Sequence, residues 1–162
     1  MNKTKSPTLT SLYNSFSDSE KVSKNWLKAI GLYSRGEWSV AILRCGTCLE
    51  LAVNFAIREE FVKARKLPLR FVDKLLLNAN GIHNKYQNLY LPIMNEYDEI
   101  DDLKKLWTEI ISVVNKERND VVHKGEFRNK IKATMIMQNT RAALTELMAL
   151  HGCESRIAVF EE

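Results

Sequence analysis

The residues with the greatest chemical capacity in this chain lie in one short segment, Arg118-Asn119-Asp120-Val121-Val122-His123, which Lys124 and Gly125 follow. A guanidinium stays charged and can bind two phosphate oxygens at once, so Arg118 is suited to stabilise extra negative charge at a phosphorus atom. An imidazole has an unperturbed pKa near ~6.5, so His123 can accept or donate a proton near neutral pH. Both roles suit cleavage of a phosphodiester whose nucleophile, the 2′-hydroxyl of RNA, belongs to the substrate.

A purely structural interpretation of the same segment also stands. An Arg near a helix C-terminus commonly caps carbonyls or pairs with an acid, here Glu117 or Asp120, and a His shortly before Gly is common at helix ends. In a continuous helix, at about 100° per residue, Arg118 and His123 point roughly 140° apart. Their cooperation in catalysis therefore requires a break in the helix or a second subunit, and Gly125 indicates that the helix ends close by.

The rest of the chain is expected to hold this segment in an all-α domain. Glycine and proline are rare, with six and three residues, and apolar residues recur at the three- and four-residue spacing of amphipathic helices. With 162 residues, of which 45% are hydrophobic, the chain is long enough for one buried core. We predict a flexible leader over 1–16, a helical domain over 17–152 and a C-terminal tail of unknown role over 153–162.

Five helices are predicted, over about 17–36, 37–65, 69–79, 101–118 and 127–150. The first is capped by Ser17 or Asp18 and ends at Gly36. The last is expected to carry its apolar residues on one side, namely Ile131, Met135, Ala142 and Met148. The segment 80–97 is predicted to be irregular. Its basic and aromatic residues either pack over the bundle, which is the favoured interpretation, or stack on the bases of single-stranded RNA; they are His83, Lys85, Tyr86, Tyr90 and Tyr97.

The second helix has a heptad-like seam of apolar residues, Trp38, Ala41, Cys45, Cys48, Ala52 and Phe55. Its small members let a neighbouring helix approach closely, so this helix is predicted to form the centre of the bundle. Cys45 and Cys48 have the C-x-x-C spacing of some metal and redox sites, but no second Cys pair or nearby His completes a zinc set. We therefore interpret both as core residues and predict no metal site.

Charge and cysteine content limit the class of protein. The net charge of +4 is compatible with an anionic partner such as RNA, but it does not establish one. The odd number of cysteines, three, and the lack of an apolar signal segment favour a reducing cytoplasm. The apolar runs look too short and too often interrupted by charges to cross a bilayer, so we predict a soluble protein without a membrane partner.

The segment 118–123 resembles the signature of the HEPN superfamily, in which an Arg is followed, after four to six residues, by a His at the end of a core helix. A polar residue often follows the Arg directly, and Asn119 fills that place here. The long helix at 38–65, the position of the motif and the closing helix extend the resemblance over about 18–150. The resemblance implies an all-α, up-and-down bundle of four to five helices.

The resemblance further implies a metal-independent endoribonuclease that cuts single-stranded RNA through attack of the 2′-hydroxyl, in stress response or phage defence, without a cofactor. Members of the superfamily form homodimers whose motifs face each other, which supplies a second imidazole. The resemblance assigns catalysis to Arg118, His123 and Asn119. Lys124 and Arg44 are predicted to bind substrate, while Glu50 and Asp120 hold the site side chains in place; Arg44 and Glu50 are equally well explained as solvated flank residues.

One toxin subgroup of the superfamily carries a Tyr two residues after the His, and its modification silences the enzyme. Gly125 stands at that position here, which argues against membership of that toxin pair. Abortive-infection and other defence proteins remain, with an antitoxin or regulatory protein as a partner. The alternative function is a non-catalytic HEPN module that binds RNA, a nucleotide or a partner protein, and the plainest is a helical interaction domain without a ligand.

Overall fold

A computed structural model describes Tyr13 and residues 15–161, and all regular secondary structure in that part is helical, as predicted. Apart from Tyr13, Ser15 and Phe16, the predicted leader lies outside the described residues. Six continuous helices follow one another: α2 (Asp18–Ser34); α3 (Trp38–Arg58) with the π-helix η1 (Glu59–Ala64); α4 (Leu69–Asn78); α5 (Gly81–Lys85) with η2 (Tyr86–Tyr90) and α6 (Leu91–Met94); α7 (Ile100–Lys105) with η3 (Leu106–Ile111) and α8 (Ser112–Lys124); and α9 (Lys130–Ala149). A 3-10 turn, η4 (Glu154–Arg156), comes last.

Local signals in the sequence determine where the first helix begins and ends. The Ser17 side chain accepts a hydrogen bond from the Glu20 backbone, and the Glu20 carboxylate accepts one from the Ser17 backbone, so the two form a capping box. The helix ends at Ser34, and Gly36 has the positive φ of 77° that turns the chain toward α3. Both predicted ends are confirmed.

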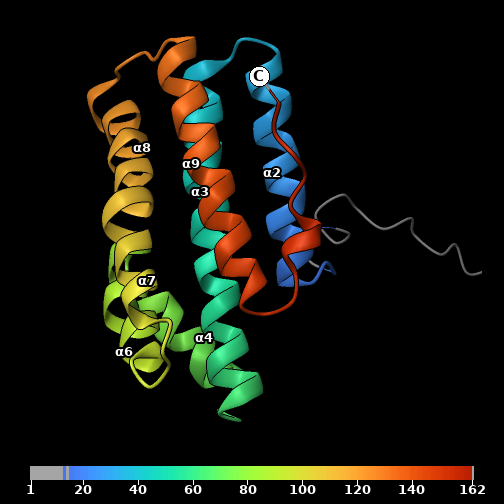
Figure 1. The fold of residues 1–162 in the computed structure, drawn as a ribbon, viewed down its shortest axis with the longest axis vertical. Helices are drawn as coiled ribbons and strands as arrows, with labels where there is room; N and C mark the ends of the chain where they lie inside the picture. The colour runs from blue at the N-terminus through green and yellow to red at the C-terminus, as the bar shows by residue number, and fades with distance from the viewer. Residues whose placement is uncertain (1–12, 14, 162) are drawn as a thin grey trace, which may run out of the picture.

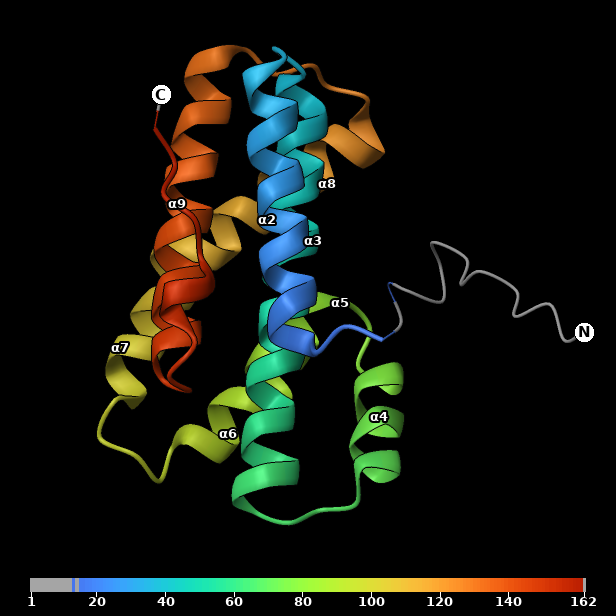
Figure 2. The ribbon, with the colours of Figure 1, turned by 90° about the vertical axis from the view of Figure 1, so that its right-hand side faces the viewer.

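Helix α3 is the centre of the bundle, with α2, α8 and α9 packed along it (Figures 1 and 2). The small residues of its seam, Ala41, Cys45, Cys48 and Ala52, are fully buried, which confirms them as core residues. Burial raises the pKa of the Cys45 thiol to about 12, so this cysteine is not a thiolate at neutral pH. The end of α8 and the start of α9 lie at one end of the bundle, and α4, α6 and α7 at the other (Figure 1).

The prediction of an irregular segment over 80–97 is wrong, and this segment raises the helix count to six. Gly81 turns the chain with a φ of 75°, and a new helix begins at that residue. Tyr86 and Tyr90 are fully buried, and the Tyr86 hydroxyl donates to the Leu103 carbonyl at 2.9 Å. These aromatic rings therefore pack in the core, in line with the favoured interpretation. The π-helical turn at η2 changes the residue spacing, which hides the helix from a 3.6-residue pattern.

The predicted apolar side of the last helix is also wrong. Met148 is buried, but Ile131 is 81% exposed and Met135 and Ala142 are exposed as well. The buried face consists instead of Ala133, Ile136, Met137, Thr140, Ala143, Leu144, Leu147 and Met148. The helix begins at Lys130, where the Asn129 side chain caps it, rather than at Phe127. Two apolar sets with helical spacing run along this helix, and only one faces α3.

The described part of the predicted tail packs against the domain. The Trp26 indole donates to the Ala158 carbonyl at 2.9 Å, and the ring of Phe160 lies edge-on to those of Trp26 and Tyr33. The Ser23 hydroxyl donates to the Arg156 carbonyl at 2.9 Å. The tail therefore covers the core side chains of α2.

One helix of the described part is long and apolar enough to cross a membrane by its length and composition, although the apolar runs were predicted to be too short for that. It is Trp38–Ala64, formed by α3 and η1. More than half of its most apolar window is buried against the other helices. This is the position of a core helix in a soluble helical protein, which is what the described residues look like.

Candidate functional site

The Arg-His motif lies on an unbroken helix. Helix α8 runs continuously from Ser112 through Lys124, and Gly125, in the left-handed conformation with a φ of 65°, ends it. The helix break that would place Arg118 and His123 on one face is therefore not present. The two side chains leave the helix in directions roughly 140° apart, so of the two conditions for their cooperation only a second subunit remains.

Arg118 is positioned by close contact with α3. Gly46 faces it, and a Cβ atom on that glycine would lie 2.7 Å from Arg118 Cγ and 3.2 Å from Arg118 Cβ. The absence of a side chain at this position thus allows the half-buried arginine to cross α3. Its Nη1 donates a hydrogen bond to Asn119 Oδ1 at 2.9 Å, and this bond restricts the orientation of both side chains.

The two acids beside Arg118 in the sequence pair with other cations. Glu117 accepts from Arg128 Nε at 2.7 Å and lies 3.3 Å from Lys132 Nζ. Burial alone would raise the pKa of Glu117, but these two hydrogen bonds outweigh it and lower the pKa. Asp120 lies 2.7 Å from both Lys116 Nζ and Lys124 Nζ.

The interpretation in which Arg118 pairs with Glu117 or Asp120 is therefore wrong. Among the described residues no carboxylate pairs with the Arg118 guanidinium. A permanently charged, half-buried group without a counter-charge is suited to receive an anion from outside.

His123 is exposed in the last turn of α8, and no hydrogen bond or ion pair joins its imidazole to another described residue. It is thus not a buried, fully bonded core histidine, the condition that would have favoured an interaction domain without a ligand. Its neighbour Lys124 is 60% exposed despite the ion pair with Asp120. An imidazole and an ammonium group are therefore open to solvent side by side in the sequence.

Arg44 and Glu50 lie apart from the motif. Arg44 Nη1 donates to Asn25 Oδ1 on α2 at 3.1 Å, and Glu50 forms an ion pair of 2.7 Å with the buried Lys85 of α5. Figure 1 shows α2 and α8 on opposite sides of the bundle, with α3 and α9 between them. The contacts found for Arg44 and Glu50 do not bring either side chain to Arg118 or His123, and their predicted roles stay predictions.

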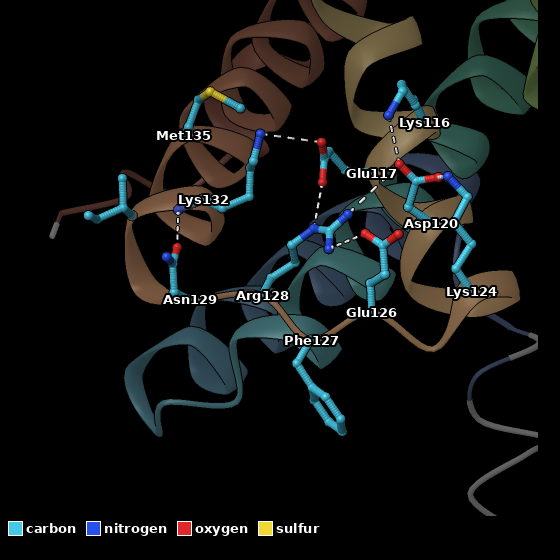
Figure 3. Close-up of a pocket in the computed structure, with 11 residues that line it drawn as sticks. Lys116, Glu117, Asp120, Lys124, Glu126, Phe127, Arg128, Asn129, Lys132 and Met135 are labelled. Carbon is cyan, nitrogen blue, oxygen red and sulfur yellow. Dashed lines mark hydrogen bonds and ion pairs between the residues drawn. The ribbon is translucent and has the colours of Figure 1, made fainter.

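An open cleft of about 630 Å³ lies between the end of α8 and the start of α9 (Figure 3). Its rim carries ion pairs among Lys116, Glu117, Asp120, Lys124, Glu126, Arg128 and Lys132, and the apolar residues Phe127, Ile131 and Met135 line it too. Of these residues, only Lys124 and Asp120 were predicted from the sequence to belong to the site. The role of Gly46 was not predicted either, although a glycine inside a long helix is itself a signal of close packing. The described residues contain no group of three or more His, Cys, Asp or Glu able to hold a metal ion.

Asp120 is expected to stabilise the fold only while it is ionised. Hydrogen bonds from Lys116 and Lys124 hold its pKa at about 2, against an ordinary value of 3.8. Because the unfolded chain takes up this proton at the higher pH, the contribution is present above about pH 4 and is lost as the pH falls toward about 2. Thermal melts followed by circular dichroism should show a higher Tm for the wild type than for Asp120→Asn near neutral pH, with the two converging near pH 2. A gap that stays constant with pH would contradict this role.

The arrangement at the end of α8 can bind a phosphate through Arg118 and exchange a proton through His123, provided that a second chain brings the two groups together. Comparison of the chain with protein-family models, with curated proteins and with solved structures finds no match.

Proposed function

We propose that this chain is a HEPN-type, metal-independent endoribonuclease of single-stranded RNA that acts as a homodimer in stress response or phage defence. In the dimer, Arg118 of one protomer and His123 of the other act on the same phosphate. The observation that carries the proposal is the half-buried guanidinium of Arg118, which has no carboxylate partner among the described residues although acids precede it by one residue and follow it by two. Its charge is thereby left for a phosphate.

The proposed reaction needs only groups that the chain and RNA supply. The neutral imidazole of His123 takes the proton of the 2′-hydroxyl, and the 2′-oxygen attacks the adjacent phosphorus. Arg118, held by Asn119, stabilises the added negative charge. The bond from phosphorus to the 5′-oxygen then breaks, and the protonated imidazole gives its proton to that oxygen. The products are a 2′,3′-cyclic phosphate and a 5′-hydroxyl end.

The experiment incubates the purified full chain with single-stranded and with duplex RNA in the presence of EDTA. We expect cleavage of the single strand and 5′-hydroxyl ends, which polynucleotide kinase can label directly. Arg118→Ala and His123→Ala should each slow the cleavage by about 100-fold or more. Cleavage that persists unchanged in both variants, or that EDTA abolishes, would contradict the proposal.

A second candidate, a non-catalytic HEPN module that binds RNA or a nucleotide, is favoured by one observation. On the unbroken helix α8 of a single protomer, Arg118 and His123 face different directions, so a monomer would bind an anion without cutting it. Sedimentation velocity distinguishes the two candidates: a monomer that binds RNA without turnover supports the module, and a dimer that cleaves RNA supports the enzyme.

A further inference from the structure

The loop between α8 and α9 is anchored on the far, C-terminal side of Phe127, and an ion pair joins the two residues that flank this Phe. On the far side, the Arg128 backbone N–H donates to Ser39 Oγ on α3 at 2.8 Å, and the Arg128 guanidinium reaches Glu117 at 2.7 Å and Glu126 at 2.6 Å. Asn129 accepts from the Lys132 backbone at 3.0 Å and so caps α9. The backbone that carries Phe127 therefore has a fixed position relative to α3, α8 and α9.

Phe127 itself is 92% exposed, and its ring points away from the ion pairs of the cleft (Figure 3). A fully exposed Phe contributes almost nothing to the fold. On a fixed loop, however, its ring is presented for contact with little loss of conformational entropy on binding. The flat face of an aromatic ring is the surface on which nucleic-acid bases stack.

The segment that contains Phe127 has an excess of positive over negative side chains. Residues 116–132 contain six Lys and Arg against three Asp and Glu, a net charge of +3 out of +4 for the whole protein. Lys116 is 70% exposed at the cleft and leaves α8 within about 20° of His123 in projection. Single-stranded RNA bound at His123 would thus pass next to exposed ammonium groups. Their positive charge favours a polyanion over an apolar protein surface as the binding partner.

We infer that Phe127 and the cleft beside it form a binding subsite for one nucleotide of the single-stranded RNA, close to the nucleotide that is cut. The base of this nucleotide stacks on the Phe127 ring, and the phosphates of the neighbouring RNA backbone pass the exposed ammonium groups of Lys116 and Lys124. This inference rests on the proposed function, because it takes RNA as the substrate. The Cα atoms of His123 and Phe127 are four residues apart and hence at most ~14 Å from each other, a span that keeps the subsite next to the reacting phosphate.

The test measures binding of a fluorescent single-stranded RNA with 2′-O-methyl groups, which lacks the nucleophile and cannot be cut. Phe127→Leu keeps an apolar side chain but removes the aromatic face, and it should weaken binding about 10-fold or more. Phe127→Tyr keeps the face and should stay within about two-fold of wild type. Phe71→Leu on α4, at the other end of the bundle, is the matched control, because this Phe is also exposed, at 51%. Lys116→Gln should lower the slope of log Kd against log salt concentration by about 0.7.

Binding by Phe127→Leu equal to wild type would overturn the subsite, as would equal losses in Phe127→Leu and Phe127→Tyr. If Phe127→Leu binds RNA normally but sediments as a smaller species, Phe127 belongs to an interface between copies, which also overturns the inference. The proposed function is tested separately, because the same protein preparations are also assayed for cleavage of unmodified RNA. If the wild type cleaves RNA and Phe127→Leu binds RNA as tightly as the wild type, only the subsite is rejected. Binding losses as expected, without cleavage by any protein, reject only the enzyme.

Discussion

Replacing His123 by alanine is expected to slow RNA cleavage by about 10²–10⁴-fold, because a positioned general acid or base typically contributes that much. The imidazole is exposed, and within the described residues it bonds to no other side chain, so its removal leaves packing and ion pairs in place. The rate should therefore fall while the Tm and the affinity for uncleavable RNA change little. Single-turnover cleavage measured beside thermal melts gives both quantities.

The matched control for this variant is Val122→Ala, which shortens an exposed side chain of the same helical turn. Its cleavage rate should equal that of the wild type. If His123→Ala cleaves at the wild-type rate, His123 is not the proton-transfer group. If both variants lose activity together with thermal stability, the loss reflects damage to the last turn of α8 rather than to catalysis.

Gly46→Ala is expected to lower cleavage by about 10- to 100-fold without touching a charged group. The new Cβ would lie 2.7 Å from Arg118 Cγ, a contact that the arginine stem must relieve by moving. Displacement of a transition-state group by about 1 Å can cost about 10²-fold in rate. The rate constant for cleavage at saturating RNA reports the effect.

Gly31→Ala on α2 is a matched control, because its new Cβ meets only the flexible end of Arg35 at 3.5 Å. It should leave cleavage unchanged and stabilise the fold by about 0.5–1 kcal/mol, the usual gain of Ala over Gly inside a helix. The double variant Gly46→Ala/Arg118→Ala should cleave no more slowly than Arg118→Ala alone. An additional loss in the double variant would show that Gly46 acts through something other than Arg118.

Local patterns in the sequence predicted much of the fold. The cap at Ser17, the seam of α3 and the all-α class are confirmed, because each depends on neighbours a few residues apart. The helical stretch at 81–94 was missed because its π-helical turn breaks the 3.6-residue period. The wrong face was chosen for α9 because Ile131 and Met135 repeat with the same spacing as the buried residues, and periodicity alone does not say which set meets α3.

The candidate site was harder to predict, since its geometry depends on contacts distant in sequence. The motif names Arg118 and His123, but Gly46 lies 72 residues before Arg118 and no local pattern links the two. The pairing of Glu117 and Asp120 likewise depends on Arg128, Lys132, Lys116 and Lys124, of which the first two belong to the next loop and helix. The sequence therefore predicts the reactive groups, while tertiary packing decides which of them keeps a free charge.

The central claim is a site formed by Arg118 of one protomer and His123 of the other. Its most direct test is to mix the two impaired chains, Arg118→Ala and His123→Ala. After dissociation and reassociation in equal amounts, about half of the dimers contain one chain of each kind, and each of these has one intact pair of Arg118 and His123 across the interface. The mixture is predicted to recover up to about a quarter of the wild-type cleavage rate, although each variant alone is slower than the wild type by about 100-fold or more. No recovery from chains that demonstrably exchange partners would contradict a site built from Arg118 of one protomer and His123 of the other.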